Sequence, residues 1–318
     1  MNQARDKVTG EIIDAESLKH LYEDGLSEYE CIDEKCKIKL LPCSYKPTNK
    51  NRPYFKTYKG DNHKKTCQFS LYLKLLEKAR KRALTNYELE DMPFPTKFQR
   101  LKQIDTTNIT SKTDDLGQEQ SRKSAVRRKA SGEFVEVLNK SKVVASISPI
   151  VDFYLKCPYN RNTELEIENE SMLYRYWFKR IEKPISKGNY KGKRIFFGRL
   201  HAGENKITET EDFMDITLYE CEGWKSGSRQ KLPKQQINPF IVRINKTIIS
   251  KNKLSRIKNE IGYVIEEKKN AFKNDEANKK KAFIFFLGEA PKAEDPYVFN
   301  VLEGALVSRY TQILPTKN

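Results

Sequence analysis

Residues 29–67 have the sequence YECIDEKCKIKLLPCSYKPTNKNRPYFKTYKGDNHKKTC, which contains two short pairs of metal-binding side chains. Cys31 and Cys36 form the first pair, and His63 and Cys67 form the second. Thiolate and imidazole are the ligands that zinc prefers, and four protein ligands leave no open position for catalysis. The spacing therefore predicts one structural zinc ion in a zinc-ribbon-like module.

A third cysteine, Cys43, lies between the two pairs and is an alternative to Cys36 as a ligand. Four of the six cysteines precede residue 68, and the other two, Cys157 and Cys221, stand alone. Cysteines of a cytosolic protein are expected to be reduced, so we expect no disulfide. The early cysteines are predicted metal ligands, and the late ones are predicted core or surface thiols.

The segment between the ligand pairs combines cations with aromatic rings. Its cations are Lys35, Lys37, Lys39, Lys46, Lys50, Arg52, Lys56, Lys59, Lys64 and Lys65. Such a mixture suits contact with phosphates and stacking on bases. We take Lys64, Lys65 and Arg80, which lies on the predicted helix that follows, as candidate nucleic-acid contacts. The alternative is a solvated loop whose rings form the small core of the module.

Several short features of this segment occur in a fixed order. They are an Ala-x-x-x-x-x-Gly opening at Ala4 to Gly10, then Ile13, Asp14, Ala15, Tyr29, Cys31, Cys36, Tyr54, Phe55, His63 and Cys67. In this order they resemble the N-terminal zinc-binding segment of competence CoiA-like bacterial proteins. The resemblance covers about the first seventy residues and implies a metal and a DNA-related role. In that family a nuclease domain follows, whereas we find no nuclease motif downstream, so the resemblance leaves the activity open.

The composition indicates a folded protein with an anionic partner. The chain has 318 residues, 37% of them hydrophobic, and a formal net charge of +17. A strong positive charge favours nucleic acid first, and an acidic protein or a membrane surface second. The N-terminus lacks the apolar stretch of a secretory signal, and the longest apolar run, Ala282 to Leu287, is too short to span a bilayer. We therefore expect a cytoplasmic protein without a membrane segment.

Changes in composition divide the chain into three predicted parts. Residues 1–103 are the zinc-binding module, with an amphipathic basic helix after Cys67. Residues 104–132 are poor in apolar side chains, which predicts a flexible linker. Residues 133–318 are predicted to form an α+β domain that binds nucleic acid.

Hydrophobic periodicity predicts the elements of this last domain. We expect helices at 148–155, 170–181 and 254–272, and strands at 194–202, 213–221, 240–249, 282–287 and 297–302. The predicted fold class is α+β with a mainly antiparallel sheet. The order of strands, a helix and more strands fits a small OB-like barrel, and it also fits other open α+β sheets.

Two basic stretches of this domain are candidate contacts to nucleic acid. No acid occurs from Gly223 to Lys258, a stretch that begins with a tryptophan and three nearby cations. We single out Trp224, Lys225, Arg229 and Lys231 there, together with Lys193 and Arg194 before the first strand. In a barrel of this kind, such loops hold a single strand while an indole stacks on a base. The alternative is a solvated, lysine-rich rim.

The sequence favours a protein that binds nucleic acid, DNA first, through a structural zinc module and a basic α+β domain. We expect a role in DNA metabolism, mobile-element or phage-related processes. One alternative is a divergent metal-dependent nuclease, for which Asp215, Glu220 and Glu222 are the nearest carboxylates. Another is a non-enzymatic adaptor that binds an acidic protein. If the chain is an enzyme, the sequence favours a nuclease.

Overall fold

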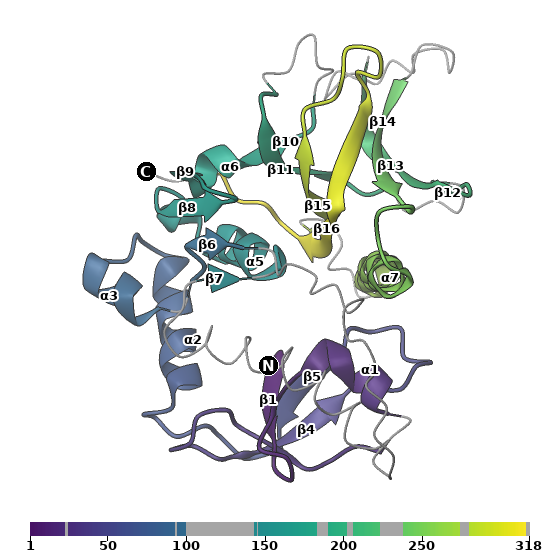
Figure 1. The fold of residues 1–318 in the computed structure, drawn as a ribbon. Coiled ribbons are helices and arrows are strands. Elements are labelled where there is room, and N and C mark those ends of the chain that lie inside the picture. The colour runs from purple at the N-terminus through teal and green to yellow at the C-terminus, as the bar shows by residue number, and fades with distance from the viewer. Residues whose placement is uncertain are drawn as a thin grey trace, which may run out of the picture. The chain divides into compact units, whose positions relative to one another are not determined.

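The computed structural model describes residues 1–22, 25–92, 94–99, 143–144, 146–182, 190–201, 206–222, 238–273 and 280–315. The chain divides into two compact units (Figure 1). The first contains Met1–Ala145 and Glu166–Asn169, and the second contains Ser146–Leu165 and Glu170–Asn318. The predicted linker at 104–132 lies outside the described residues. Sheets in both units are mostly antiparallel, which confirms the α+β class.

The first unit is built on a five-stranded antiparallel sheet of order β2-β1-β3-β4-β5. Its strands are β1 (Gln3–Asp6), β2 (Ile12–Asp14), β3 (Tyr29–Glu30), β4 (Lys39–Cys43) and β5 (Tyr54–Thr57). The cluster of buried side chains on this sheet is small, and consists of Ala4, Ala15, Leu18, Tyr29, Leu40 and Phe55. A core of this size contributes little stability by itself.

Short helices and strands complete the first unit. They are η1 (Ala15–Ser17), α1 (Leu18–Leu21), α2 (Gln68–Ala79), α3 (Asn86–Asp91), β6 (Lys97–Phe98) and β7 (Val143–Val144). The predicted helix after Cys67 is confirmed as α2. Helix α3 begins at a capping box, in which Thr85 and Glu88 satisfy each other's backbone amides. The same Glu88 carboxylate accepts hydrogen bonds from Lys78 and Arg82, which ties α3 to the end of α2.

The second unit begins with short elements and continues into a large curled sheet. The short elements are α5 (Ser148–Lys156), η3 (Pro158–Asn160), β9 (Glu170–Leu173), α6 (Tyr174–Trp177) and β10 (Phe178–Arg180). Strand β8 (Glu164–Ile167) has its first two residues in this unit and its last two in the first. The elements that follow are β11 (Lys193–Arg199), β12 (Ile207–Glu209), β13 (Phe213–Glu222), β14 (Asn238–Asn245), α7 (Lys251–Lys273), β15 (Lys281–Glu289) and β16 (Val298–Thr311). None of the described helices combines the length and hydrophobicity needed to cross a bilayer.

The large sheet has the order β10-β11-β15-β16-β14-β13-β12, with β10 and β12 at its two ends. Neighbours are antiparallel except for the parallel pairs β10–β11 and β14–β16. An antiparallel bridge between Leu200 and Leu218 joins the end of β11 to β13. Strands β11, β15, β16, β14 and β13 therefore form a closed circuit.

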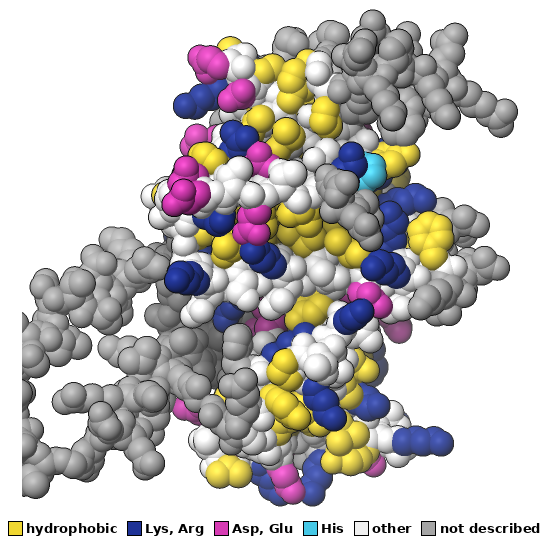
Figure 2. Space-filling model, turned by 90° about the vertical axis from the view of Figure 1, so that its right-hand side faces the viewer, with side chains coloured by type: hydrophobic (Ala, Val, Ile, Leu, Met, Phe, Trp, Pro, Cys, Tyr) yellow, Lys and Arg dark blue, Asp and Glu magenta, His cyan; other side chains and the backbone are white. Residues whose placement is uncertain are grey.

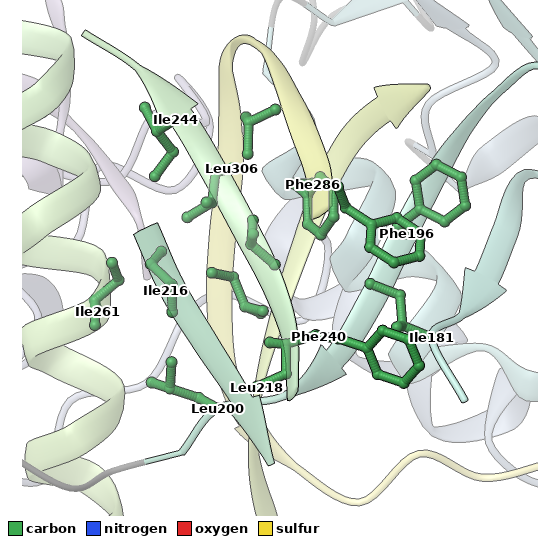
Figure 3. Close-up of a cluster of buried hydrophobic side chains, with 14 of the residues drawn as sticks. Ile181, Phe196, Leu200, Ile216, Leu218, Phe240, Ile244, Ile261, Phe286 and Leu306 are labelled. Carbon is green, nitrogen blue, oxygen red and sulfur yellow. The ribbon is translucent and has the colours of Figure 1, made fainter. Parts of the chain in front are cut away.

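A hydrophobic core fills this circuit, and α7 covers one end of it (Figures 1 and 3). Strand side chains such as Ile216 and Phe286 meet Ile257, Ile261 and Val264 of α7 in one buried cluster. On the outer side, Phe285 of β15 packs against other aromatic rings. Strand β15 is thus buried on both faces, which explains the continuous apolar run from Ala282 to Leu287.

The helix predicted at 170–181 is wrong, because the segment forms β9, the single turn α6 and then β10. Tertiary contacts fix this conformation. The Trp177 indole donates a hydrogen bond to the Leu165 carbonyl at 2.7 Å, and the Phe178 ring stacks on Tyr154 with centroids 3.7 Å apart. The aromatic residues of this segment have helical spacing, but they lie on two short strands and one helical turn and not on one face of a long helix.

Gly288→Ala is expected to destabilise the second unit by about 1–3 kcal/mol, because it overpacks a closed site. A Cβ atom at Gly288 would lie 2.6 Å from the backbone oxygen of Asn300. At Gly262 of α7 a Cβ meets nothing within 4 Å, so Gly262→Ala is the matched control. That control is expected to stabilise by about 0.5–1 kcal/mol, because alanine favours the helix. Urea unfolding of both variants checks the sign, and equal stabilities would contradict the close approach.

Candidate metal centre

Three sulfur atoms and one ring nitrogen meet in the first unit. The ligand atoms of Cys31, Cys36, His63 and Cys67 all lie within 4.8 Å of one another. The Sγ atoms of Cys31 and Cys67 are 3.7 Å apart, and His63 Nδ1 is 3.5 Å from the Sγ atoms of both Cys36 and Cys67. Zinc bonds of about 2.3 Å to sulfur and about 2.0 Å to nitrogen give tetrahedral edges of about 3.8 and about 3.5 Å. The predicted ligands are therefore brought together, and the group can hold a tetrahedral metal ion.

The first ligand pair is held in a tight turn after β3. The Asp33 carbonyl accepts hydrogen bonds from the amides of Cys36 and Lys37, and the Cys31 amide donates to the Ile38 carbonyl at 2.8 Å. Lys37 adopts a left-handed backbone with φ of 47°, which closes the turn and returns the chain toward β4. The four residues between the cysteines thus form a compact loop that aims both sulfurs at one point.

The second ligand pair ends at the N-cap of α2, which is Cys67. Asp33 connects this helix to the first pair, because its Oδ2 accepts from the Gln68 amide at 2.7 Å and its Oδ1 from the Lys35 amide at 2.9 Å. Burial alone would raise the pKa of Asp33, but these backbone hydrogen bonds outweigh the effect of burial and lower the pKa. Asp33 was not among the predicted site residues, although it positions both ligand pairs.

The environment of the thiols differs from one to the next. Burial raises the pKa of Cys31 and of Cys67. Burial also opposes ionisation of Cys36, but backbone hydrogen bonds from Lys64 and Ile38 outweigh it and hold its pKa below the usual value. Deprotonation of the buried thiols therefore depends on a bound cation, because a metal ion replaces the proton on sulfur.

His63 presents Nδ1 to the sulfurs. Burial, followed by the positive charge of the N-terminus, lowers its pKa and keeps the imidazole neutral, which is the form that binds metal. Its Nε2 is buried, and among the described residues it has no hydrogen-bond partner. The ring packs against Phe69, with centroids 5.0 Å apart. The orientation of His63 is thus fixed by packing on α2.

Cys43 lies outside the ligand group. It ends β4, and its Sγ lies 3.7 Å from the Leu41 carbonyl. The group of four contains Cys36, which was the first choice from the sequence.

The other predicted site residues are spread over different parts of the chain. Lys64, Lys65 and Arg80 are exposed in the first unit, where Lys64 Nζ donates to the Lys35 carbonyl at 2.7 Å. Lys193 and Arg194 begin β11 in the second unit and are half-buried, with the Arg194 guanidinium 5.8 Å from the Trp177 ring. The structure does not describe 223–237, which contains Trp224, Lys225, Arg229 and Lys231.

The structure also shows a polar face on the outer side of β13 and β14, which was not among the predicted sites. The Arg243 guanidinium pairs with Asp215 at 2.7 Å and lies 4.9 Å from the centre of the Phe213 ring. Further along β13, the Arg199 guanidinium lies 4.2 Å from the centre of the Tyr219 ring. The signal in the sequence is the alternation along 213–219, which places every second side chain outside.

The carboxylates considered for a nuclease are held by arginines. Asp215 accepts two hydrogen bonds from Arg243, and buried Glu220 accepts from the side chain of Arg199 at 2.7 Å and from its amide at 2.8 Å. Because successive side chains alternate along a strand, the two acids also point to opposite faces of β13. The side chain of Glu222 lies outside the described part. This arrangement does not favour the nuclease alternative.

Fold and site together define an α+β protein with a Cys3His group that can hold a metal ion. Comparisons with protein-family models, with curated proteins and with solved structures gave no match to this chain.

Proposed function

We propose that the chain binds nucleic acid through an OB-type barrel in its second unit, and that a structural zinc ion stabilises a ribbon-like module in its first. The observation that carries the proposal is the closed circuit of β11, β13, β14, β15 and β16, with α7 between the third and fourth of these strands. An OB-fold is a five-stranded Greek-key barrel that binds oligonucleotides or oligosaccharides on its second and third strands.

Charge favours an oligonucleotide over an oligosaccharide. The formal net charge is +17, and phosphate neutralisation by lysine and arginine is the main source of affinity for nucleic acid. On the face drawn in Figure 2, Lys and Arg side chains are interspersed with exposed hydrophobic ones and with several acidic ones. This combination suits a strand whose phosphates contact cations and whose bases stack on apolar surface.

The corresponding second and third strands are β13 and β14. Their outer side carries the rings of Phe213 and Tyr219 and the guanidinium of Arg243. Stacking of Arg243 on Phe213, with its charge fixed by Asp215, provides a preorganised surface for a base. The resemblance of the first seventy or so residues to CoiA-like proteins supports DNA as the partner, and a role in DNA metabolism or in mobile-element or phage-related processes.

The test is fluorescence anisotropy of the full-length protein with a labelled single strand of about sixteen nucleotides, the upper end of one OB site. We expect affinity that falls with salt, with a slope of about 0.7 per phosphate contact. Phe213→Ala is expected to cost about 1–3 kcal/mol with an unchanged slope, because stacking releases no counterions. Tyr87→Ala, which removes an exposed ring from α3, is the control.

Two outcomes would contradict this proposal. If neither a single strand nor the matching duplex binds in a salt-dependent way, an adaptor for an acidic protein is favoured instead. If Phe213→Ala and Tyr87→Ala both leave affinity unchanged, the outer face of β13 is not the binding surface.

A further inference from the structure

A basic pocket lies at the rim of the barrel, where α7 ends and β15 begins. Its volume is about 180 Å³, which is smaller than the roughly 300–1,000 Å³ of pockets that enclose a whole cofactor. Residues from five segments line it, among them Arg199, Tyr219, Lys268, Phe272, Lys280 and Lys281. Its size and composition suit one small anionic group next to one flat ring.

Among the described residues, the cations that line this pocket outnumber the carboxylates that pair with them. Arg199 is paired with Glu220, but no carboxylate is among the described residues that line the pocket. Lys268, Lys280 and Lys281 form no ion pair within the described part of the chain. Three lysines around one concave site attract a phosphate group, because it carries the opposite charge.

Two aromatic rings that line the pocket are exposed to solvent. Phe272 is 65% exposed and Tyr219 is 37% exposed, whereas most phenylalanines of this unit are buried in the core. Lys268 and Phe272 are four residues apart on α7, so they share one face of the helix. A cation and a free ring side by side can contact the phosphate and the base of the same nucleotide.

A half-buried histidine next to the pocket has a ring nitrogen without a hydrogen-bond partner among the described residues. The His201 ring lies 5.8 Å from that of Tyr219, and its Nδ1 is buried without a partner among the described residues. Burial, together with the charges of Lys206 and Lys268, lowers the pKa of His201. The neutral imidazole adds no charge to this end of the barrel, and positive charge there remains concentrated on the lysines.

We propose that this pocket binds one nucleotide unit, with its phosphate on Lys268, Lys280 and Lys281 and its base against Phe272 and Tyr219. The inference rests on the proposed function for its choice of ligand, and it adds a site at the barrel rim to the β13–β14 face. The same chemistry is offered by a nucleotide within a strand and by a free mononucleotide.

The first arm of the test measures strand binding by the full-length protein, as above. Phe272→Ala is expected to weaken binding about 5- to 150-fold without changing the salt slope, and Phe272→Trp to restore it, because stacking needs only a ring. Lys268→Ala is expected to reduce the slope by about 0.7, the value for one lost contact to a single strand. Lys269→Ala removes the same charge from the next residue, which is exposed, and is expected to change neither the affinity nor the salt slope.

The second arm uses thymidine monophosphate and thymidine, followed by ligand-observed NMR. The monophosphate is expected to bind in competition with inorganic phosphate and to lose binding in Lys268→Ala but not in Lys269→Ala. If the wild-type protein binds the monophosphate but no strand, the proposed function fails and the pocket is a site for free nucleotides. If it binds a strand while Phe272→Ala and Lys268→Ala behave like Lys269→Ala in both arms, the pocket inference is overturned and the proposed function stands.

Discussion

Cys67→Ser is expected to unfold the first unit, whereas Cys43→Ser is expected to leave it folded. The buried cluster on the sheet of this unit contains six of the described residues, so we expect the ligand bonds to supply most of its stability. Structural zinc contributes about 10–16 kcal/mol to the folding of small zinc domains. Cys67 also begins α2 and lies beside Asp33, so its loss disconnects the helix from the first ligand pair.

Elemental analysis and circular dichroism check this prediction. We expect one zinc ion per chain in the wild-type protein and in Cys43→Ser, whose sulfur lies outside the ligand group. Cobalt substitution should give the visible absorption of a tetrahedral thiolate site in both. A wild-type protein that keeps the folded signal of its first unit after chelation would refute the structural role, as would full metal content in Cys67→Ser.

The four candidate ligands were predictable because the two members of each pair are close in sequence. Short spacings within each pair, Cys31 to Cys36 and His63 to Cys67, leave the chain few ways to separate the two side chains. The role of Asp33 was not predictable, because its hydrogen bond to the Gln68 amide spans thirty-five residues and leaves no periodic signal. Local ligand chemistry is thus visible in a sequence, whereas the side chain that joins two local pieces is not.

The strands of the second unit were predictable from alternation, but their closure was not. The apolar residues on every second position of β13 and β14 mark one buried face. Closure depends on the pairing of Leu200 with Leu218, and on Gly198, where a Cβ would lie 2.6 Å from the Leu218 side chain. Open and closed sheets share the same pattern of strands along the sequence. The pairing of Leu200 with Leu218 distinguishes the closed arrangement, and it leaves no signal in that pattern.

The sequence also shows only in part where positive charge is available to a ligand. Counting lysines and arginines treats each one as free, yet Arg199, Arg243 and Arg309 are each committed to carboxylates from other elements. The pocket at the barrel rim collects its lysines from both sides of 274–279. Acid-free stretches therefore locate positive charge along the chain but do not show which cations remain available to a ligand.

Arg309→Met is expected to destabilise the second unit by about 3 kcal/mol, because it removes one cationic partner from two partly buried carboxylates. Arg309 Nε donates to Asp152 of α5 at 2.8 Å, and its Nη1 lies 3.4 Å from Glu260 of α7. The Ser308 amide donates to the same Glu260 carboxylate at 3.1 Å. One side chain of β16 thus connects two helices, and its loss should lower the melting temperature by roughly 6–12 °C.

Acid titration gives this prediction a second readout. Burial alone would raise the pKa of Asp152, but the charges of Arg309 and Lys156 outweigh it and lower the pKa. A lowered carboxylate pKa means that this contact stabilises fully above the ordinary aspartate pKa and is lost as pH falls through the lowered one. The difference in stability between the wild-type protein and Arg309→Met should therefore shrink in acid. Arg256→Met removes the same charge from an exposed position of α7 and is expected to cost little at any pH. Equal losses in the two variants would show that Arg309 acts through net charge and does not join α5 to α7.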